Sequence, residues 1–218
     1  MAIPVEDELL PVRVMALLME PNMNSPVVIL HEPEDNRVLP IWVGEAEARS
    51  IAVGLGELEV ERPLTHMVAA NVMEALGGEL FQVAIEEIQG GTYFASLFID
   101  NGRKKPLVID VRPSDAIALA LEFGAEIFVA KSVLDAAGQD NPFPSDSIGD
   151  VAVASVKLEM NIVDVPAPSA KSHLRYRKPS SAKTNFSEEE ADQLKAMLDR
   201  AREMEANNAP EDSGDADA

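Results

Sequence analysis

An internal repeat is the sequence feature that most constrains the fold of this chain. Residues 39–56 align with residues 107–124 at an offset of 68 positions, and each segment has the pattern of a strand followed by a helix. The identical pairs are Leu39 and Leu107, Ile41 and Ile109, Val43 and Val111, Ala48 and Ala116, Ala52 and Ala120, and Gly56 and Gly124. Chance gives about one identity over such a window at average residue usage. The alignment therefore predicts two copies of one supersecondary unit.

Apolar periodicity predicts three strands and one helix in each copy. The first copy comprises strands Val12–Met19, Pro26–His31 and Val38–Val43 and a helix Glu45–Leu55. The second comprises strands Leu80–Ile88, Thr92–Ile99 and Leu107–Val111 and a helix from Pro113 to Phe123. A helix Thr65–Leu76 separates the copies, and a strand Glu126–Val129 and a helix Ser132–Ala137 follow them. This tandem β-β-β-α duplication predicts an α+β fold with a mainly antiparallel or mixed sheet and packed helices.

The charge of the chain limits its partners. It has 38 Asp and Glu against 18 Lys and Arg, a formal net charge of −20. A field of this sign repels phosphate, which excludes a broadly basic surface for nucleic acids. The net charge is −17 over residues 1–170, +5 over 171–186 and −8 over 187–218. A nucleic-acid function would therefore depend on a local basic patch or on metal ions held by carboxylates.

The same charge pattern predicts how the chain is divided. Residues 1–140 form the main domain, with its core at 12–137, and residues 141–170 extend it. Residues 171–186 read as a basic linker. Ser187 and Glu190 form a capping box that opens an acidic amphipathic helix over 187–206, a possible surface for a protein partner. Residues 207–218 are expected to be a disordered acidic tail.

Three further sequence features bear on where in the cell the protein is located. The chain has no cysteine, so disulfides, thiolate metal sites and cysteine nucleophiles are excluded. The first residues lack a basic segment followed by an apolar core, so we expect no signal peptide. No run approaches the roughly 18 apolar residues of a membrane-spanning helix. The expected location is the cytoplasm, without contact with a membrane.

Four ordered motifs carry a resemblance to a known family. They are Leu39-Pro40-Ile41-Trp42-Val43-Gly44 with Glu47-Ala48 and Ile51-Ala52; Arg62-Pro63-Leu64-Thr65-His66; Gly91-Thr92-Tyr93-Phe94-Ala95; and Asp110-Val111-Arg112-Pro113-Ser114-Asp115-Ala116-Ile117-Ala118-Leu119-Ala120. With these motifs the chain resembles the bifunctional nuclease (BFN) domain family over residues 12–137. The resemblance implies degradation of DNA and RNA with a divalent metal. The family pattern has an Asp after Thr-His, whereas this chain has Met67.

Carboxylates at the two strand-to-helix junctions are the candidate metal ligands. Phosphodiester hydrolysis needs a nucleophilic water and charge neutralisation, which Mg²⁺ or Mn²⁺ held by carboxylates supplies. Glu45 and Glu47 lie at the start of the first repeat helix, and Asp110 and Asp115 lie at the matching place in the second. If the copies pack with pseudo-two-fold symmetry, the junctions converge into an acidic pocket. The alternative is that these acids only complement helix dipoles, cap a helix or hold a turn.

Two further residues are candidates for roles at the same place. Arg112 lies between a strand end and a helix start, where it either clamps a phosphate or pairs with Asp115 or Glu47 to lock the junction. His66 follows Thr65, the expected N-cap of its helix. A pKa near neutrality suits His66 to general acid catalysis, and a hydrogen-bonded structural histidine is the alternative.

The main domain has one basic cluster, Arg103-Lys104-Lys105, after the Asn101-Gly102 turn. It reads either as a solvated loop or, together with the linker at 171–186, as the electrostatic contact for a nucleic acid. Trp42 is on the opposite strand face from Ile41 and Val43, and it either stacks on a base or packs in a core or interface. The apolar strand faces around Trp42 make a homo-oligomer a plausible state.

The first hypothesis is accordingly a cytoplasmic nuclease that hydrolyses DNA and RNA phosphodiester bonds with a divalent metal. A non-catalytic interaction or regulatory module that keeps the family fold is the alternative, and Met67, the scarcity of basic residues and the acidic tail favour it. A sensor that binds a small ligand in the junction pocket is a third possibility.

Overall fold

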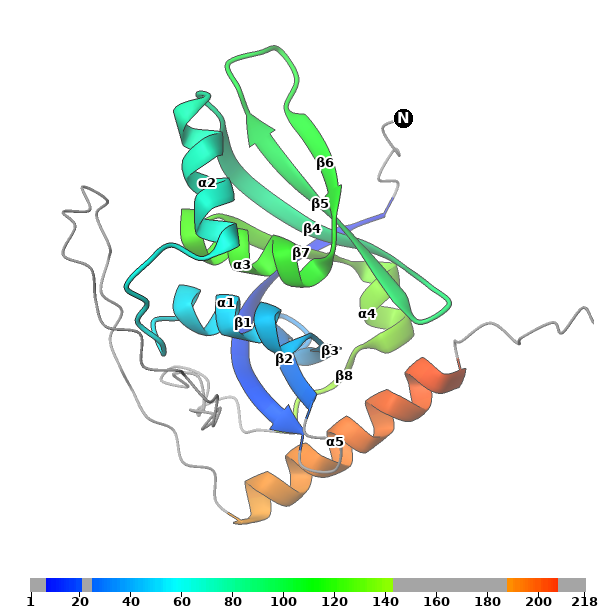
Figure 1. The fold of residues 1–218 in the computed structure, drawn as a ribbon. Helices are drawn as coiled ribbons and strands as arrows, with labels where there is room; N and C mark the ends of the chain where they lie inside the picture. The colour runs from blue at the N-terminus through cyan, green and yellow to red at the C-terminus, as the bar shows by residue number, and fades with distance from the viewer. Residues whose placement is uncertain (1–6, 21–24, 143–187, 208–218) are drawn as a thin grey trace, which may run out of the picture.

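The chain folds into two three-stranded meanders that share one sheet (Figure 1). The structure, a computed structural model, describes residues 7–20, 25–142 and 188–207. The first unit is β1 (Leu9–Glu20), β2 (Ser25–Glu32), β3 (Arg37–Trp42) and α1 (Glu45–Gly54). The second is β4 (Glu79–Gln89), β5 (Thr92–Asp100), β6 (Leu107–Val111) and α3 (Pro113–Phe123). The element order confirms the tandem β-β-β-α units.

The remaining elements connect and complete these units. Helix α2 (Thr65–Ala75) lies between the two copies in the chain, and β7 (Glu126–Ala130), α4 (Lys131–Ala137) and β8 (Gln139–Asp140) follow α3. The sheet has the strand order β6-β5-β4-β7-β1-β2-β3-β8. Strand β7 joins the meanders because it pairs parallel with β4 and antiparallel with β1. The sheet is therefore mixed, as the α+β prediction stated.

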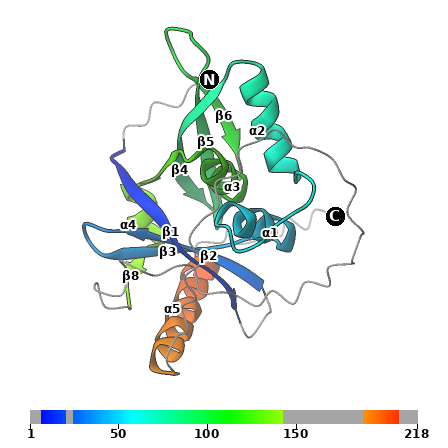
Figure 2. The same ribbon diagram turned by 90° about the vertical axis from the view of Figure 1, so that its left-hand side faces the viewer.

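The helices pack against one face of the sheet and bury the main core. Helix α3 contacts β4, β5 and β7, whereas α1 contacts β1 and β2 and also packs along α3. Figure 2 shows α1, α2 and α3 on the same side of the sheet. Fully buried side chains such as Ile51, Ile85 and Ile117 come from both units, so the units share one core. This sharing places the first turns of α1 and α3 next to each other.

The opposite face of the first meander is covered by the C-terminal helix α5 (Glu188–Asn207). Met197 and Leu198 are buried there against β1, β2 and β3, and Leu194 packs beside them. The Arg202 guanidinium lies 5.5 Å from the centroid of the Trp42 ring and also pairs with buried Glu20. The apolar side of the helix therefore packs on its own chain, and so does the strand face around Trp42 that suggested a homo-oligomer.

Some local expectations shift or lie outside the described residues. Leu64, not Thr65, is the N-cap of α2, because Leu64 is the residue with extended backbone before the first helical turn. Helix α4 begins at Lys131, one residue before Ser132. Ser187 of the expected capping box, the linker 171–186, the tail from 208 and nearly all of the extension 141–170 are outside the described residues. Among the helices of the described ranges, none has the length and apolarity that crossing a membrane requires.

Docking of α5 can be followed through Trp42, which is the only tryptophan of the chain. We expect Leu198→Asp to release α5, because a carboxylate would be buried in an apolar contact at a cost of several kcal/mol. Trp42 then meets water, and its fluorescence maximum moves to longer wavelength. Gln193→Asp, which adds the same charge at an exposed position of the helix, should leave the spectrum unchanged. Identical spectra for the two variants would contradict this arrangement.

Candidate functional site

The two strand-to-helix junctions of the repeat meet at one place. Strand β3 ends at Trp42 and α1 begins at Glu45, and strand β6 ends at Val111 and α3 begins at Pro113. Because α1 and α3 pack side by side, their N-terminal turns face a common point. The site is therefore built from corresponding positions of the two copies.

Arg112 holds this junction together. Its Nε donates to Asp115 Oδ2 at 2.8 Å and its Nη2 donates to Asp115 Oδ1 at 3.2 Å. The same Nη2 reaches Glu47 Oε1 of the other copy at 2.9 Å. Hydrogen bonds to Asp115, and then to Glu47, raise the pKa of the Arg112 guanidinium above its ordinary value. The structure thus shows the pairing role of Arg112, with both candidate carboxylates at once.

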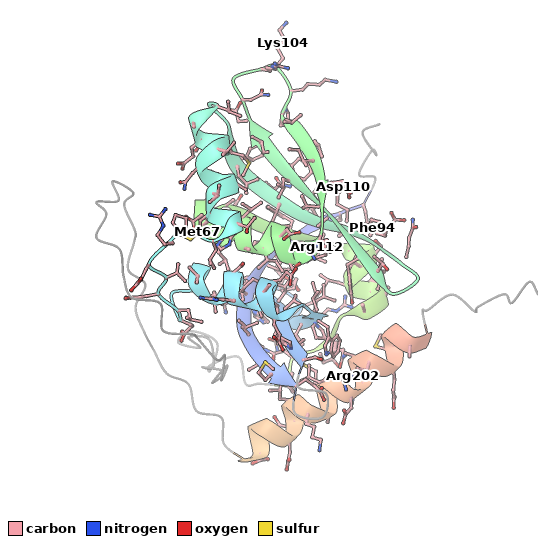
Figure 3. The ribbon with its side chains drawn as sticks, in the orientation of Figure 1. Met67, Phe94, Lys104, Asp110, Arg112 and Arg202 are labelled. Atoms are coloured by element: carbon pink, nitrogen blue, oxygen red, sulfur yellow. The ribbon has the colours of Figure 1, made fainter. Side chains whose placement is uncertain are left out.

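The guanidinium also remains open to solvent. The Arg112 side chain is 65% exposed, against 21% for Glu47 and 43% for Asp115. A guanidinium has five N–H donors, so a contact with two carboxylates leaves donors for a further anion. Figure 3 shows Arg112 at the end of β6, where α3 starts.

Both helix N-termini at the junction lack a side-chain cap. Gly44 is the N-cap of α1 and Arg112 is the N-cap of α3, and neither helix has a side-chain hydrogen bond at its N-cap. The first backbone N–H groups of a helix carry partial positive charge and bind anions. The junction therefore combines one guanidinium and two helix N-termini, a set that suits a phosphate.

Gly44 gives Glu47 the room to reach Arg112. A Cβ on residue 44 would lie 2.3 Å from Glu47 Oε2. The backbone angles of Gly44, φ −72° and ψ 162°, are open to any residue, so the need for glycine is the space that the carboxylate occupies.

His66 lies in the first turn of α2 and is 8% exposed. Neither of its ring nitrogens has a hydrogen-bond partner, which is uncommon for a buried polar group. Burial lowers the pKa of His66, and the negative charge of Asp115 partly opposes that effect. His66 is therefore a neutral imidazole close to the Asp115 carboxylate, and the hydrogen-bonded structural histidine considered above is not what the structure shows.

The junction contains two carboxylates that a magnesium ion could use, and Arg112 is paired with both of them. Mg²⁺ binds through one or two carboxylates and completes its shell with waters and substrate phosphates. Glu47 and Asp115 supply two carboxylates from two helices, with Arg112 between them. Met67, next to His66, is partly buried and adds no carboxylate. In the described ranges, no group of three or more His, Cys, Asp or Glu side chains is placed so that it could hold a metal ion.

Two other candidate carboxylates lie outside this cluster. Glu45 is exposed at the start of α1. Asp110 is exposed on β6, opposite Ser96 of β5, whose hydroxyl donates to Glu86 Oε2. Among the ion pairs of the described residues, none includes Asp110 or Glu45. The structure therefore brings together Glu47, Arg112, Asp115 and His66 and leaves Asp110 and Glu45 apart from them.

The candidate basic residues Arg103, Lys104 and Lys105 are in the exposed loop between β5 and β6. Figure 3 shows Lys104 at the tip of this loop, at the opposite end of β6 from Arg112. At the usual rise of a strand, the five residues of β6 alone put roughly 13 Å between its two ends, and the loop adds to this separation. Within one chain the loop is therefore remote from the junction.

Sequence reasoning did not find the role of Gly44 or the burial of His66. At an offset of 68 residues, Gly44 aligns with Arg112. That alignment was the sequence signal from which the role of Gly44 could have been found. The burial of His66 depends on how α2 packs against α3, which no local pattern reports.

Comparison with known proteins places this geometry in a family. The model of the bifunctional nuclease domain matches residues 28–142, more than half of the chain. The chain belongs to the bifunctional nuclease domain family. All residues of the Glu47, His66, Arg112 and Asp115 cluster are inside the matched range.

Relatives of this bifunctional nuclease domain differ in how much is known of them. An uncharacterized protein of Mycobacterium tuberculosis is 39% identical over 148 residues, which are 68% of this chain and 88% of that protein. Bifunctional nuclease 2 of Arabidopsis thaliana is 29% identical over 110 residues, 50% of this chain and 33% of that protein. Bifunctional nuclease 1 of Oryza sativa subsp. indica is 26% identical over 144 residues, 64% of this chain and 42% of that protein. The plant proteins are thus much longer than the segment they share with this chain.

The burial of His66 predicts a pH dependence of stability. Because the folded-state pKa lies below the ordinary value of 6.5, the unfolded chain binds more protons between the two values. The free energy of unfolding therefore falls as the pH drops below 6.5 and is fully recovered above it. We expect the urea midpoint of the wild type to fall more between pH 8 and pH 5.5 than that of His66→Asn. Equal falls would show that His66 does not titrate in this way.

The close contact between residue 44 and Glu47 predicts that substitutions at these two positions have coupled effects on the free energy of unfolding. We expect Gly44→Ala to displace the Glu47 carboxylate from Arg112 and to cost about 1 kcal/mol, since a partly exposed ion pair is lost. In the Glu47→Gln background the same substitution should cost less, because the displaced charge is already absent. Urea unfolding of the four proteins of this cycle gives the coupling energy. An equal cost in both backgrounds would rule out the contact.

Proposed function

We propose that this domain hydrolyses phosphodiester bonds of DNA and RNA at the junction of α1 and α3, with Mg²⁺ or Mn²⁺, in the cytoplasm. The observation that carries the proposal is the exposed Arg112 guanidinium, held between Glu47 and Asp115 at two uncapped helix N-termini. Membership of the bifunctional nuclease domain family and the names of the plant relatives support it.

Each residue of the cluster has a chemical task in this reaction. Arg112 and the first-turn N–H groups of α1 bind the scissile phosphate and neutralise the charge that develops on its oxygens, and α3, which begins with Pro113, adds the N–H of Ser114. Glu47 and Asp115 orient Arg112 and would hold the metal ion. The ion, when bound, supplies charge neutralisation and an activated water. His66, as a neutral imidazole, would act as the general base that takes a proton from the attacking water.

The acidity of the chain shapes how this site meets its substrate. A net charge of −20 repels nucleic acid over a distance, so binding relies on Arg112, the helix N-termini and the metal ion. Added salt screens this repulsion as well as the attraction at the site. Cleavage should therefore depend less steeply on salt than cleavage by a nuclease with a basic surface.

A non-catalytic module is the second candidate, and one observation favours it. Arg112 already neutralises both carboxylates, and Met67 stands where a third carboxylate would lie in the family pattern. In that case the Arg112 pairs only lock α1 against α3, and the domain works by binding a partner.

Cleavage assays on single-stranded DNA and RNA separate these candidates. With Mg²⁺ or Mn²⁺ we expect cleavage by the wild type and a fall in kcat/KM of about 10²-fold in Arg112→Lys and Asp115→Asn, since each loses a charge-assisted contact in the transition state. Asp110→Asn should lose less than Asp115→Asn, because Asp110 is apart from the cluster. Glu126→Gln, at the exposed first residue of β7, is the matched control.

Three outcomes would contradict this function or its site. If the purified wild type cleaves neither substrate with either metal, the domain is not a nuclease. Equal cleavage by all the variants would place the reaction elsewhere or attribute it to a contaminant. A fall that is larger in Asp110→Asn than in Asp115→Asn would move the metal site from the junction to the outer face of β6.

A further inference from the structure

The exposed large apolar side chains of the described residues gather at one end of the molecule. These side chains are at least 38% exposed, and all belong to α2, β4, β5 or β6 except Leu76, which directly follows α2. They are Val68, Val72, Leu76, Phe81, Phe94, Leu107, Val108 and Ile109. Summed over both faces of the sheet, their apolar surface is on the order of 600 Å², at the upper end of the largest patches found on soluble monomers. Such a surface is typical of a protein interface.

Strand β6 is the edge of the sheet on this side; Lys105 and Pro106 precede it and Asp110 lies within it, but residues 107–109 have no such protection. It pairs with β5 on one side only among the described strands. Natural edge strands are usually short, or carry lysine, proline or a bulge that prevents further pairing. The other edge, β8, has two residues, whereas β6 has five and reads Leu-Val-Ile-Asp-Val. Leu107, Val108 and Ile109 are between 38% and 48% exposed, so β6 offers free backbone groups between apolar side chains.

Helix α2 packs on α3 at the same end of the helical layer. Like β6, it exposes apolar side chains to solvent. Its buried residues His66 and Ala70 face the core. Val68 and Val72, four residues apart, form an apolar stripe on its outward side, 48% and 51% exposed. A surface helix normally carries polar residues on that side. The sheet edge and the outermost helix are thus both left apolar.

The charges of this end point to a second copy of the same chain as the occupant. Residues 101–112 contain Arg103, Lys104, Lys105 and Arg112 against one acid, Asp110, in a chain that is otherwise strongly acidic. The acids Glu47 and Asp115 lie at the far end of β6 from the basic loop. One strand therefore has a basic start and an acidic end. Antiparallel pairing with an identical strand brings each basic start beside the other's acidic end.

We propose that two copies associate through antiparallel pairing of β6 with β6 about a two-fold axis, and that the Arg103–Lys105 loop of each copy completes the junction site of the other. If Ile109 faces its counterpart, Leu107 lies opposite the second copy's Val111, and the loop lies beside the second copy's Arg112. Such a pairing is isologous and closed, so it produces a dimer and not a fibre. It also gives the acidic site the cations that the same chain places at the opposite end of β6.

The proposed association of two copies is tested by measuring the mass of the protein in solution. We expect light scattering after gel filtration to give twice the mass of the 23.5 kDa chain for the wild type. Ile109→Lys and Leu107→Lys, which place a charge on the free edge, should give the monomer mass with an unchanged circular dichroism spectrum. Phe81→Lys is the matched control, because Phe81 is similarly exposed but lies two strands in from the edge. A monomeric wild type, or a dimer that only Phe81→Lys dissociates, would overturn the pairing.

The part that concerns the loop rests on the proposed nuclease activity and is tested by complementation. Chains with Arg112→Ala and chains with Lys104→Ala and Lys105→Ala are co-expressed with different tags, and the heterodimer is purified through both tags. If the loop acts on the second copy, one of the two sites is complete, and about half of the wild-type activity returns. If the loop acts on its own chain, neither site is complete, and activity stays at the level of the two parent variants.

The results of these two tests distinguish a failure of the dimer from a failure of the proposed nuclease function. An inactive wild type that is dimeric in the first test refutes the nuclease function and keeps the dimer. An active heterodimer at the level of its parents keeps the nuclease function and removes the contribution of the loop to the second copy's site.

Discussion

The ion pairs of Arg112 are the interactions on which the rest of the site depends. Without the guanidinium, Glu47 and Asp115 would face each other as like charges at two helix N-termini. Those N-termini are adjacent because α1 and α3 share a core under the two meanders. The same contact therefore joins the two copies of the repeat and gathers the groups that can act on a phosphate. An exposed ion pair adds little stability by itself, so its value here is the placement of charge.

The arrangement also explains how a strongly acidic protein can present a phosphate site. Charge that repels a polyanion is spread over the whole chain, whereas the positive groups at the junction are few and fixed in position. The carboxylates keep Arg112 in one orientation, and the uncapped helices add partial charges that need no basic side chain. In the proposed function, these groups would bind a phosphate weakly and hold it at the junction of α1 and α3. A site of this kind discriminates by geometry and not by long-range attraction.

The sequence predicted the fold well because the information is local and is repeated. Strand Leu107–Val111 was predicted with its observed ends, and the alternation that put Trp42 opposite Ile41 and Val43 is what the two cores show. For the site, the repeat predicted that the junctions would meet, but Arg112 remained open between phosphate and carboxylates. The burial of His66 and the cover that α5 provides for Trp42 depend on contacts between segments far apart in the chain. No periodicity within either segment reports such contacts.

The duplication itself accounts for the asymmetry of the site. At an offset of 68 residues, Arg112 corresponds to Gly44 and Asp115 corresponds to Glu47. Two arginines at these positions would repel each other across the junction, and two glycines would leave both carboxylates without a counter-charge. One glycine and one arginine resolve both problems, because the glycine leaves space for the longer acid, and the arginine reaches both acids. Neither symmetric pair gives the junction a single shared cation, so the observed ion pairs arise from the difference between the two copies and not from the repeat alone.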